Sequence, residues 1–184
     1  YKFEDTINIG FDNSGNNNHI TFADPDSTTL VEDSKVGNYS VSITKSLISD
    51  IVFNLNNNDF SATFWINIRS YTMYHYMFWC QDIINSGDNW FGFTFDNAGE
   101  LKWHSYNGTH THVLISNAYT LNEWVHYAWI YTSDGSILIY KDGIEIVNEP
   151  QFRIINVDFR ATFNITEGNS FYIDDLRFYN KKGR

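Results

Sequence analysis

The chain has 184 residues and a formal net charge of −10 at pH 7, and 18% of its residues are aromatic. This length suits one domain whose core needs no disulfide, and the single cysteine, Cys80, could form none within the chain. The acidic balance argues against nucleic acid as a partner, and no apolar run approaches the roughly 20 residues of a membrane-spanning helix.

Short alternating segments separated by turn residues begin at the start of the chain. Residues 1–6 make the first predicted strand, and in residues 60–68 the even-numbered residues form one apolar face. Residues 91–95 and 100–106 flank a four-residue loop and predict a hairpin. Asn107-Gly108 then predicts a tight turn into residues 109–116.

Residues 124–147 give the strongest structural signal. Two Asp-Gly pairs, at 134–135 and 142–143, separate three apolar runs, and Asp-Gly between alternating hydrophobic residues is typical of a hairpin turn. We therefore predict a three-stranded antiparallel meander. By alternation one face carries Trp124, His126, Ala128 and Ile130, and the other carries Val125, Tyr127, Trp129 and Tyr131. Because both faces are apolar or aromatic, we expect one to be covered and the other to be able to bind something.

Residues 171–179 make the final predicted strand. About a dozen short strands with turn signals roughly every ten residues predict an all-β sandwich. We expect a single domain over residues 1–184. Because the chain begins at Tyr1 rather than Met and shows no signal peptide, we expect it to be a segment of a larger protein.

Five motifs, in order, resemble laminin G-like domains of the concanavalin A-like lectin and glucanase superfamily. They are Tyr1-Lys2-Phe3-Glu4 with Asp12-Asn13-Ser14-Gly15-Asn16, Val36-Gly37-Asn38-Tyr39-Ser40-Val41, Phe60-Ser61-Ala62-Thr63-Phe64-Trp65-Ile66, Trp124-Val125-His126-Tyr127-Ala128 with Leu138-Ile139-Tyr140-Lys141-Asp142-Gly143, and residues 171–180. The resemblance implies a two-sheet antiparallel jelly roll whose first and last strands pair near the termini. It also implies framework packing for Trp65, Trp124 and His126, with His126 as a hydrogen-bonded core residue.

Glu4, Asp12 and Asp174 are the candidate metal ligands. Asp174 alternates with Leu176, so we expect its carboxylate to point toward the apolar face, where it needs a partner or a cation. Ca²⁺ binds several carboxylate and carbonyl oxygens, which suits the loop at Asp12. The resemblance likewise implies a structural calcium ion between the first loop and the last strand. The alternative is that Asp174 pairs with an arginine such as Arg177 or caps a turn.

Aromatic residues of the middle strands are the candidate ligand-binding site. Sugar rings pack on aromatic planes, and His, Asn and Asp side chains bind sugar hydroxyls. Most aromatic residues of a sandwich belong to its core, so only some of these can form an exposed platform. The candidates are Tyr74, Trp79, Trp90, His104 and Tyr106.

Two catalytic or metal-dependent alternatives have little support in the sequence. His104, His110 and His112 could form an open zinc site if neighbouring strands aligned them, but nothing supplies a general base at a fixed spacing. Retaining glucanases of the resembled superfamily carry two glutamates on one strand around an aspartate, and Glu145 and Glu149 lack that spacing. We therefore do not predict an enzyme.

The favoured hypothesis is a non-catalytic recognition module that binds carbohydrate or a protein surface, within an extracellular or surface-exposed protein. The competing hypothesis is a building block that contacts neighbouring subunits in a virion, an appendage or a surface coat, with no small ligand. A glycan-cleaving enzyme is a weaker third. Sequons at Asn38, Asn107 and Asn164 add slight support for a secretory route.

Overall fold

The computed structural model describes residues 1–7, 9–14, 19–22, 28–44, 47–54, 58–71, 75–82, 90–96, 98–106, 110–149, 158–163 and 169–182. Within these, only the backbone is described for residues 21–22, 47–54, 58, 75–82, 110–112, 158–163 and 180–182. The described residues form fourteen β-strands and no helix, as the sequence predicts. No helix in this part of the chain is therefore long and apolar enough to cross a membrane.

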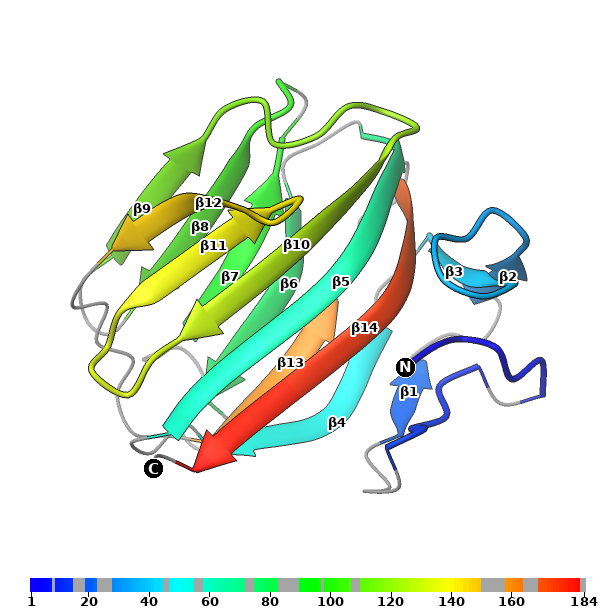
Figure 1. Ribbon diagram of the computed structural model, residues 1–184, viewed down its shortest axis with the longest axis horizontal. Coiled ribbons are helices and arrows are strands. Elements are labelled where there is room, and N and C mark those ends of the chain that lie inside the picture. Colours follow the sequence, from blue (N-terminus) through cyan, green and yellow to red (C-terminus); the bar gives the residue numbers. More distant parts are fainter. Residues whose placement is uncertain are drawn as a thin grey trace.

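Two antiparallel sheets of seven strands each lie face to face and confirm the predicted sandwich (Figure 1). The back sheet has the order β1 (Ile20–Phe22), β4 (Leu47–Asn54), β13 (Asp158–Phe163), β6 (His75–Asp82), β7 (Trp90–Phe95), β8 (Leu101–Tyr106) and β9 (His110–Ile115). The front sheet has the order β12 (Ile144–Glu149), β11 (Ile137–Lys141), β10 (Trp124–Tyr131), β5 (Asn58–Ser70), β14 (Ser170–Lys182), β3 (Ser40–Ile43) and β2 (Thr28–Val31).

The core between the sheets is rich in aromatic rings. Trp129 of β10 contacts Trp103 of β8 across the interior, with ring centroids 5.0 Å apart. Phe91 of β7 lies 4.8 Å from the Trp129 ring. All three side chains are buried. Because each such ring pair contributes about 0.5–1.5 kcal/mol beyond the area that it buries, these contacts hold the two sheets together.

The predicted meander is confirmed as β10, β11 and β12. At the turn between β11 and β12, Asp142 and Gly143 have φ values of 52° and 80°, the left-handed pair that a two-residue primed turn needs. The connection from β10 to β11 is longer than its Asp-Gly pair and spans residues 132–136. There the Gly135 N–H donates to the Thr132 carbonyl at 2.8 Å.

The prediction that residues 1–6 form a strand is wrong. They have no strand pairing in the structure, and Phe3 has a φ of 55°, which breaks an extended conformation. The segment is fixed in another way, because Phe3 is only 2% exposed and the Tyr1 nitrogen donates to the Leu176 carbonyl at 2.6 Å. The start of the chain therefore lies beside β14 without pairing with it as a strand.

A β-bulge in β14 changes the face on which Asp174 lies. The register between β14 and β5 shifts between Asp174 and Arg177, and Asp175 has a φ of 47° within this step. One extra residue therefore lies in β14. As a result Asp174 shares the outer face with its partner Trp65, while Leu176 is buried in the core. The prediction that Asp174 points to the apolar face is wrong for this reason.

Candidate functional site on the front sheet

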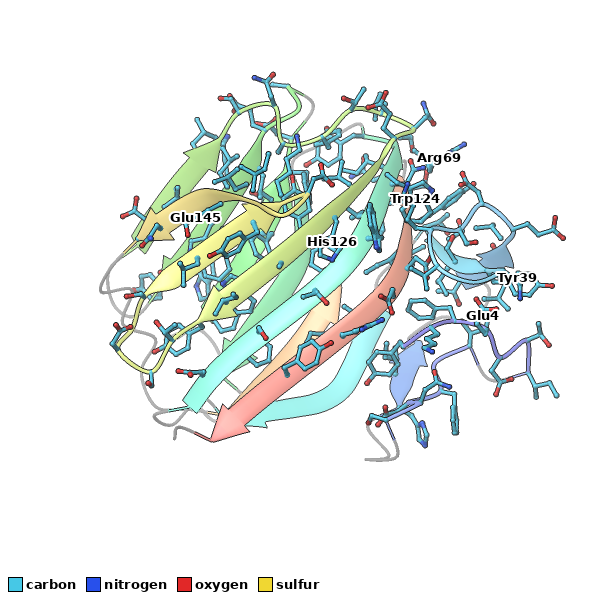
Figure 2. All side chains as sticks on the ribbon, viewed as in Figure 1. Glu4, Tyr39, Arg69, Trp124, His126 and Glu145 are labelled. Carbon is cyan, nitrogen blue, oxygen red and sulfur yellow. The ribbon has the colours of Figure 1, made fainter. Side chains whose placement is uncertain are left out.

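The outer face of the front sheet carries a compact group of aromatic, amide and charged side chains. Asn67 of β5 pairs with Trp124 of β10 on one side and with Tyr172 of β14 on the other. Two residues earlier on β5, Trp65 pairs with His126, and Figure 2 shows Trp124 and His126 on this face. We call the group the front cluster, and it consists of Trp65, Asn67, Arg69, Trp124, His126 and Tyr172 with Asp33 and Lys35 from the loop between β2 and β3.

Two cations of the front cluster lie over aromatic rings. The Lys35 ammonium is 5.0 Å from the centroid of the Trp65 ring, and the Arg69 guanidinium is 4.7 Å from that of Tyr172. The imidazole of His126 also lies 5.0 Å from the Trp65 ring. A cation over an aromatic face is attracted by about 0.5–1 kcal/mol at an exposed site. These contacts are enough to orient the two cations but not to fix them.

Asp33 connects the loop to two strands of the front cluster. Its Oδ1 accepts a hydrogen bond from Trp124 Nε1 at 2.9 Å, and its Oδ2 accepts one from Arg69 Nη1 at 3.2 Å. The Asp33 side chain is nevertheless 47% exposed and that of Arg69 32% exposed. The carboxylate is thus bound at two points while it stays accessible to solvent.

Asn67 is the buried polar residue of the front cluster. By strand alternation its side chain lies on the outer face with Trp65 and Arg69, yet only 1% of it is exposed because its neighbours cover it. Its Oδ1 has no hydrogen-bond partner among the described residues. A buried acceptor that is left unsatisfied costs about 1–3 kcal/mol. The outer face therefore contains an acceptor that a bound donor could satisfy.

His126 is mostly neutral at pH 7. Burial is the largest influence and lowers the pKa of its imidazole below the usual 6.5. The carboxylates of Asp142 and Asp175 raise the pKa of His126 and so counteract the effect of burial. The Arg177 guanidinium lowers that pKa further. A neutral imidazole offers one donor and one acceptor to a ligand on this face.

The loop that carries Asp33 and Lys35 is held by two of the three carboxylates that the sequence proposes as metal ligands. The Oδ2 of Asp174 accepts the backbone N–H groups of Lys35 and Val36, each at 2.7 Å. Glu4 Oε1 accepts those of Asn38 at 2.9 Å and Tyr39 at 3.2 Å. Figure 2 shows Glu4 and Tyr39 next to each other at this loop. The same two carboxylates thus fix the loop against the front sheet.

The third proposed ligand, Asp12, accepts the Ser14 N–H at 2.8 Å within its own loop. In the part of the chain that the structure describes, no group of three or more His, Cys, Asp or Glu side chains could hold a metal ion. Each of Glu4, Asp12 and Asp174 accepts at least one backbone N–H group. Calcium binding stays a prediction.

The structure brings three of the predicted ligand-binding residues together on the back sheet. Trp90 and Tyr106 are cross-strand partners with near-parallel rings 6.2 Å apart, and both are half-buried. His104 lies 6.4 Å from the Trp90 ring and is itself buried, with its Nε2 3.0 Å from Thr94 Oγ1. Their role in ligand binding stays a prediction.

The other predicted site residues are only partly placed. The backbone of Trp79 pairs with Gly92, the residue that also pairs with His104, but the Trp79 side chain is outside the description. Tyr74 lies outside the described residues, as do the Asn107-Gly108 turn and the sequon at Asn164. The side chains of the zinc candidates His110 and His112 are likewise outside the description, so the zinc site stays a hypothesis.

Sequence reasoning missed the front cluster although it found the signal for it. The burial of β10 alternates as predicted, with one face buried and the face of Trp124 and His126 half-buried. The assignment of His126 to the core is wrong, because its ring lies on the outer face beside Trp65. What alternation could not show is the partner of Trp124, since Asp33 lies 91 residues earlier in the chain.

Comparison with known proteins places this geometry in a family. A laminin G family model, described as the concanavalin A-like lectin/glucanases superfamily, matches residues 14–182. No curated protein matches the sequence. The match covers both sheets and every residue of the front cluster.

Several solved structures share the fold at low sequence identity. The binding domain of Paraclostridial Mosquitocidal Protein 1 superposes with a TM-score of 0.71 and 14% identity, over 94% of this chain and 46% of that one. The receptor binding domain of botulinum neurotoxin D gives 0.69 and 16%, over 94% and 46%. The binding domain of botulinum neurotoxin serotype G gives 0.67 and 14%, over 94% and 45%. The chain thus spans less than half of each of these structures.

Proposed function

Because the chain belongs to the concanavalin A-like lectin/glucanase superfamily, we propose that it is a non-catalytic recognition module that binds a saccharide at the front cluster. The binding and receptor-binding domains that share its fold support a recognition role. We further propose that the module belongs to a secreted or surface-exposed protein.

The observation that carries this proposal is the unsatisfied Oδ1 of Asn67 between two aromatic residues. A saccharide offers hydroxyl donors on its edges and C–H groups on its faces. A hydroxyl that entered between the side chains of Trp124 and Tyr172 would satisfy the acceptor, while the rings packed against the sugar. Because neighbouring side chains cover Asn67, they must shift before a hydroxyl reaches its Oδ1, and the hydrogen bond gained there offsets the cost of that shift.

The substitution Asn67→Leu separates this role from a structural one. Leu has a similar size and removes an unsatisfied polar group, so we expect the melting temperature to stay unchanged or to rise. Saccharide affinity should fall about 5- to 150-fold, the equivalent of 1–3 kcal/mol. The measurements are thermal unfolding and binding to the best ligand from a glycan array. Ser61→Ala, on the same face of β5 but beside Tyr179, is the matched control and should change neither value.

Two results would contradict the proposal in different ways. If Asn67→Leu bound the saccharide as well as the wild type, the ligand would lie elsewhere, and Trp90→Ala on the back sheet would be the next variant to measure. If the wild type bound nothing on the array, the module would not be a lectin. The assembly hypothesis, in which this domain contacts neighbouring subunits, would then take its place.

A further inference from the structure

We propose, on the premise that the front cluster binds a saccharide, that its ligand carries a carboxylate and that Asp33 occupies the carboxylate position in the free protein. The two donors that hold Asp33, Trp124 Nε1 and Arg69 Nη1, come from different strands and converge on one carboxylate. A planar guanidinium with an adjacent N–H is the arrangement that recognises carboxylates in proteins.

Asp33 is bound weakly enough to be replaced. Its contact with Arg69 is a half-exposed ion pair of 3.2 Å, and pairs of this kind contribute about 0–1 kcal/mol. No other hydrogen bond of its side chain is present among the described residues apart from that with Trp124. The backbone of the loop is held separately by Glu4 and Asp174, so the side chain can leave without loss of the loop.

The cations of the front cluster are only partly neutralised. Arg69 donates to Asp33 through Nη1 alone, and Lys35 has no ion pair within the described part of the chain. Lys35 and Arg69 together carry two positive charges against one negative charge on Asp33. On β14, Asp174 accepts backbone N–H groups and Asp175 pairs with Arg177, and among the described residues neither forms an ion pair with Lys35 or Arg69.

An anionic ligand at the front cluster would therefore meet two cations, Lys35 and Arg69, on a protein of net charge −10. A carboxylate on a sugar ring would replace that of Asp33 on Arg69 and Trp124 and place the ring near the ammonium of Lys35. Uronic acids and sialic acids share this carboxylate chemistry, and the test below distinguishes the two sources.

Matched acidic and neutral ligands test the inference directly. The probes are a glucuronate oligosaccharide with its glucose counterpart, and sialyllactose with lactose, measured by isothermal titration calorimetry. For the wild type we expect at least one acidic probe to bind more tightly than its neutral partner. The substitution Asp33→Ala empties the carboxylate position and should raise the ratio of acidic to neutral affinity at least tenfold. Arg69→Gln should lower that ratio to near one.

The variants and outcomes below separate failure of the carboxylate inference from failure of saccharide binding. Asp33→Asn serves as a second variant if Asp33→Ala unfolds, and Ser61→Ala should leave the ratio unchanged. Equal affinity for acidic and neutral probes in both the wild type and Asp33→Ala would overturn the carboxylate inference and leave saccharide binding intact. Silence of all four probes with every variant would overturn the carboxylate inference, and a glycan array without any bound ligand would overturn saccharide binding as well. The better acidic probe identifies the source of the carboxylate.

Discussion

His126 makes the stability of this protein depend on pH in a predictable direction. Burial lowers the pKa of its imidazole, against the raising influence of Asp142 and Asp175, so the unfolded chain takes up a proton at a higher pH than the folded one. Stability is therefore expected to fall as the pH drops from about 6.5 toward the lowered pKa. Urea unfolding of the wild type and of His126→Gln at pH 7.5 and pH 5.5 would show a smaller loss in the variant. An equal loss would assign the dependence to other groups.

Asp174 is expected to contribute more to the stability of the fold than Asp175 does. It is fully buried and accepts the N–H groups of Lys35 and Val36 through one oxygen and that of Asp175 through the other. In Asp174→Asn one of these oxygens becomes an amide that cannot accept, so unfolding free energy should fall by about 1–3 kcal/mol. Asp175→Asn weakens a two-point pair with Arg177, whose side chain is 48% exposed, and should cost about 1 kcal/mol or less. Denaturant unfolding at pH 7 compares the two, and equal losses would contradict the role given to Asp174.

At the residue scale, the sequence could indicate which side chains share a face but not which face becomes a site. Trp124 and His126 alternate with core residues that are equally aromatic, so composition could not tell the outer face from the inner one. The contacts that define the front cluster are long-range, as in the bond between Asp33 and Trp124. No local pattern carries such information.

Among the elements, the turn between β11 and β12 gives a prediction that depends on backbone conformation alone. Gly143 has a φ of 80°, and a Cβ added there would meet nothing within 4 Å. Gly143→Ala should therefore cost about 1 kcal/mol through backbone strain, without any steric clash. Gly143→Asn should cost less, because Asn adopts the left-handed region more readily. Thermal unfolding of both variants tests the order, and an Ala variant as stable as the Asn variant would contradict it.

Elements with strong local signals are the ones that the sequence predicts well. The meander follows from alternation and two Asp-Gly pairs, and β14 follows from its apolar run. The predicted strand at residues 1–6 fails because Phe3 takes a left-handed conformation for which its residue type gives no signal. Similarly, the alternation of apolar and polar residues around Asp174 does not predict the bulge, because the bulge is defined by the pairing of β14 with β5.

At the scale of the whole molecule, the open question of calcium has a direct measurement. An ion present at 100 times its dissociation constant would stabilise the fold by about 2.7 kcal/mol, which for a chain of this size raises the melting temperature by roughly 5–10 °C. If Glu4, Asp12 and Asp174 hold calcium, the ion should raise the melting temperature and EDTA should reverse the rise. No shift with either would contradict the calcium prediction and would leave Glu4 and Asp174 with the backbone N–H groups that they accept.

The two sheets present different candidate surfaces to solvent. By alternation with Phe91, which contacts Trp129 in the core, Trp90 lies on the outer face of the back sheet with its partner Tyr106. The front cluster lies on the outer face of the other sheet, and the two sheets lie face to face (Figure 1). A ligand bound at one surface is separated from the other by both sheets and the core. Variants of one surface should therefore report on that surface alone.

The bulge in β14 also determines which changes in chain length the fold can absorb. Loss of Asp175 would make β14 regular and would return Leu176 to the position opposite Phe64, with every other residue of the strand still on its present face. Loss of Tyr172 or Phe178 instead would move the residues on one side of the deletion to the opposite face of the sheet. Polar residues of β14 would then point into the core. Related sequences of different length should therefore gain or lose their residue at this one step of the strand.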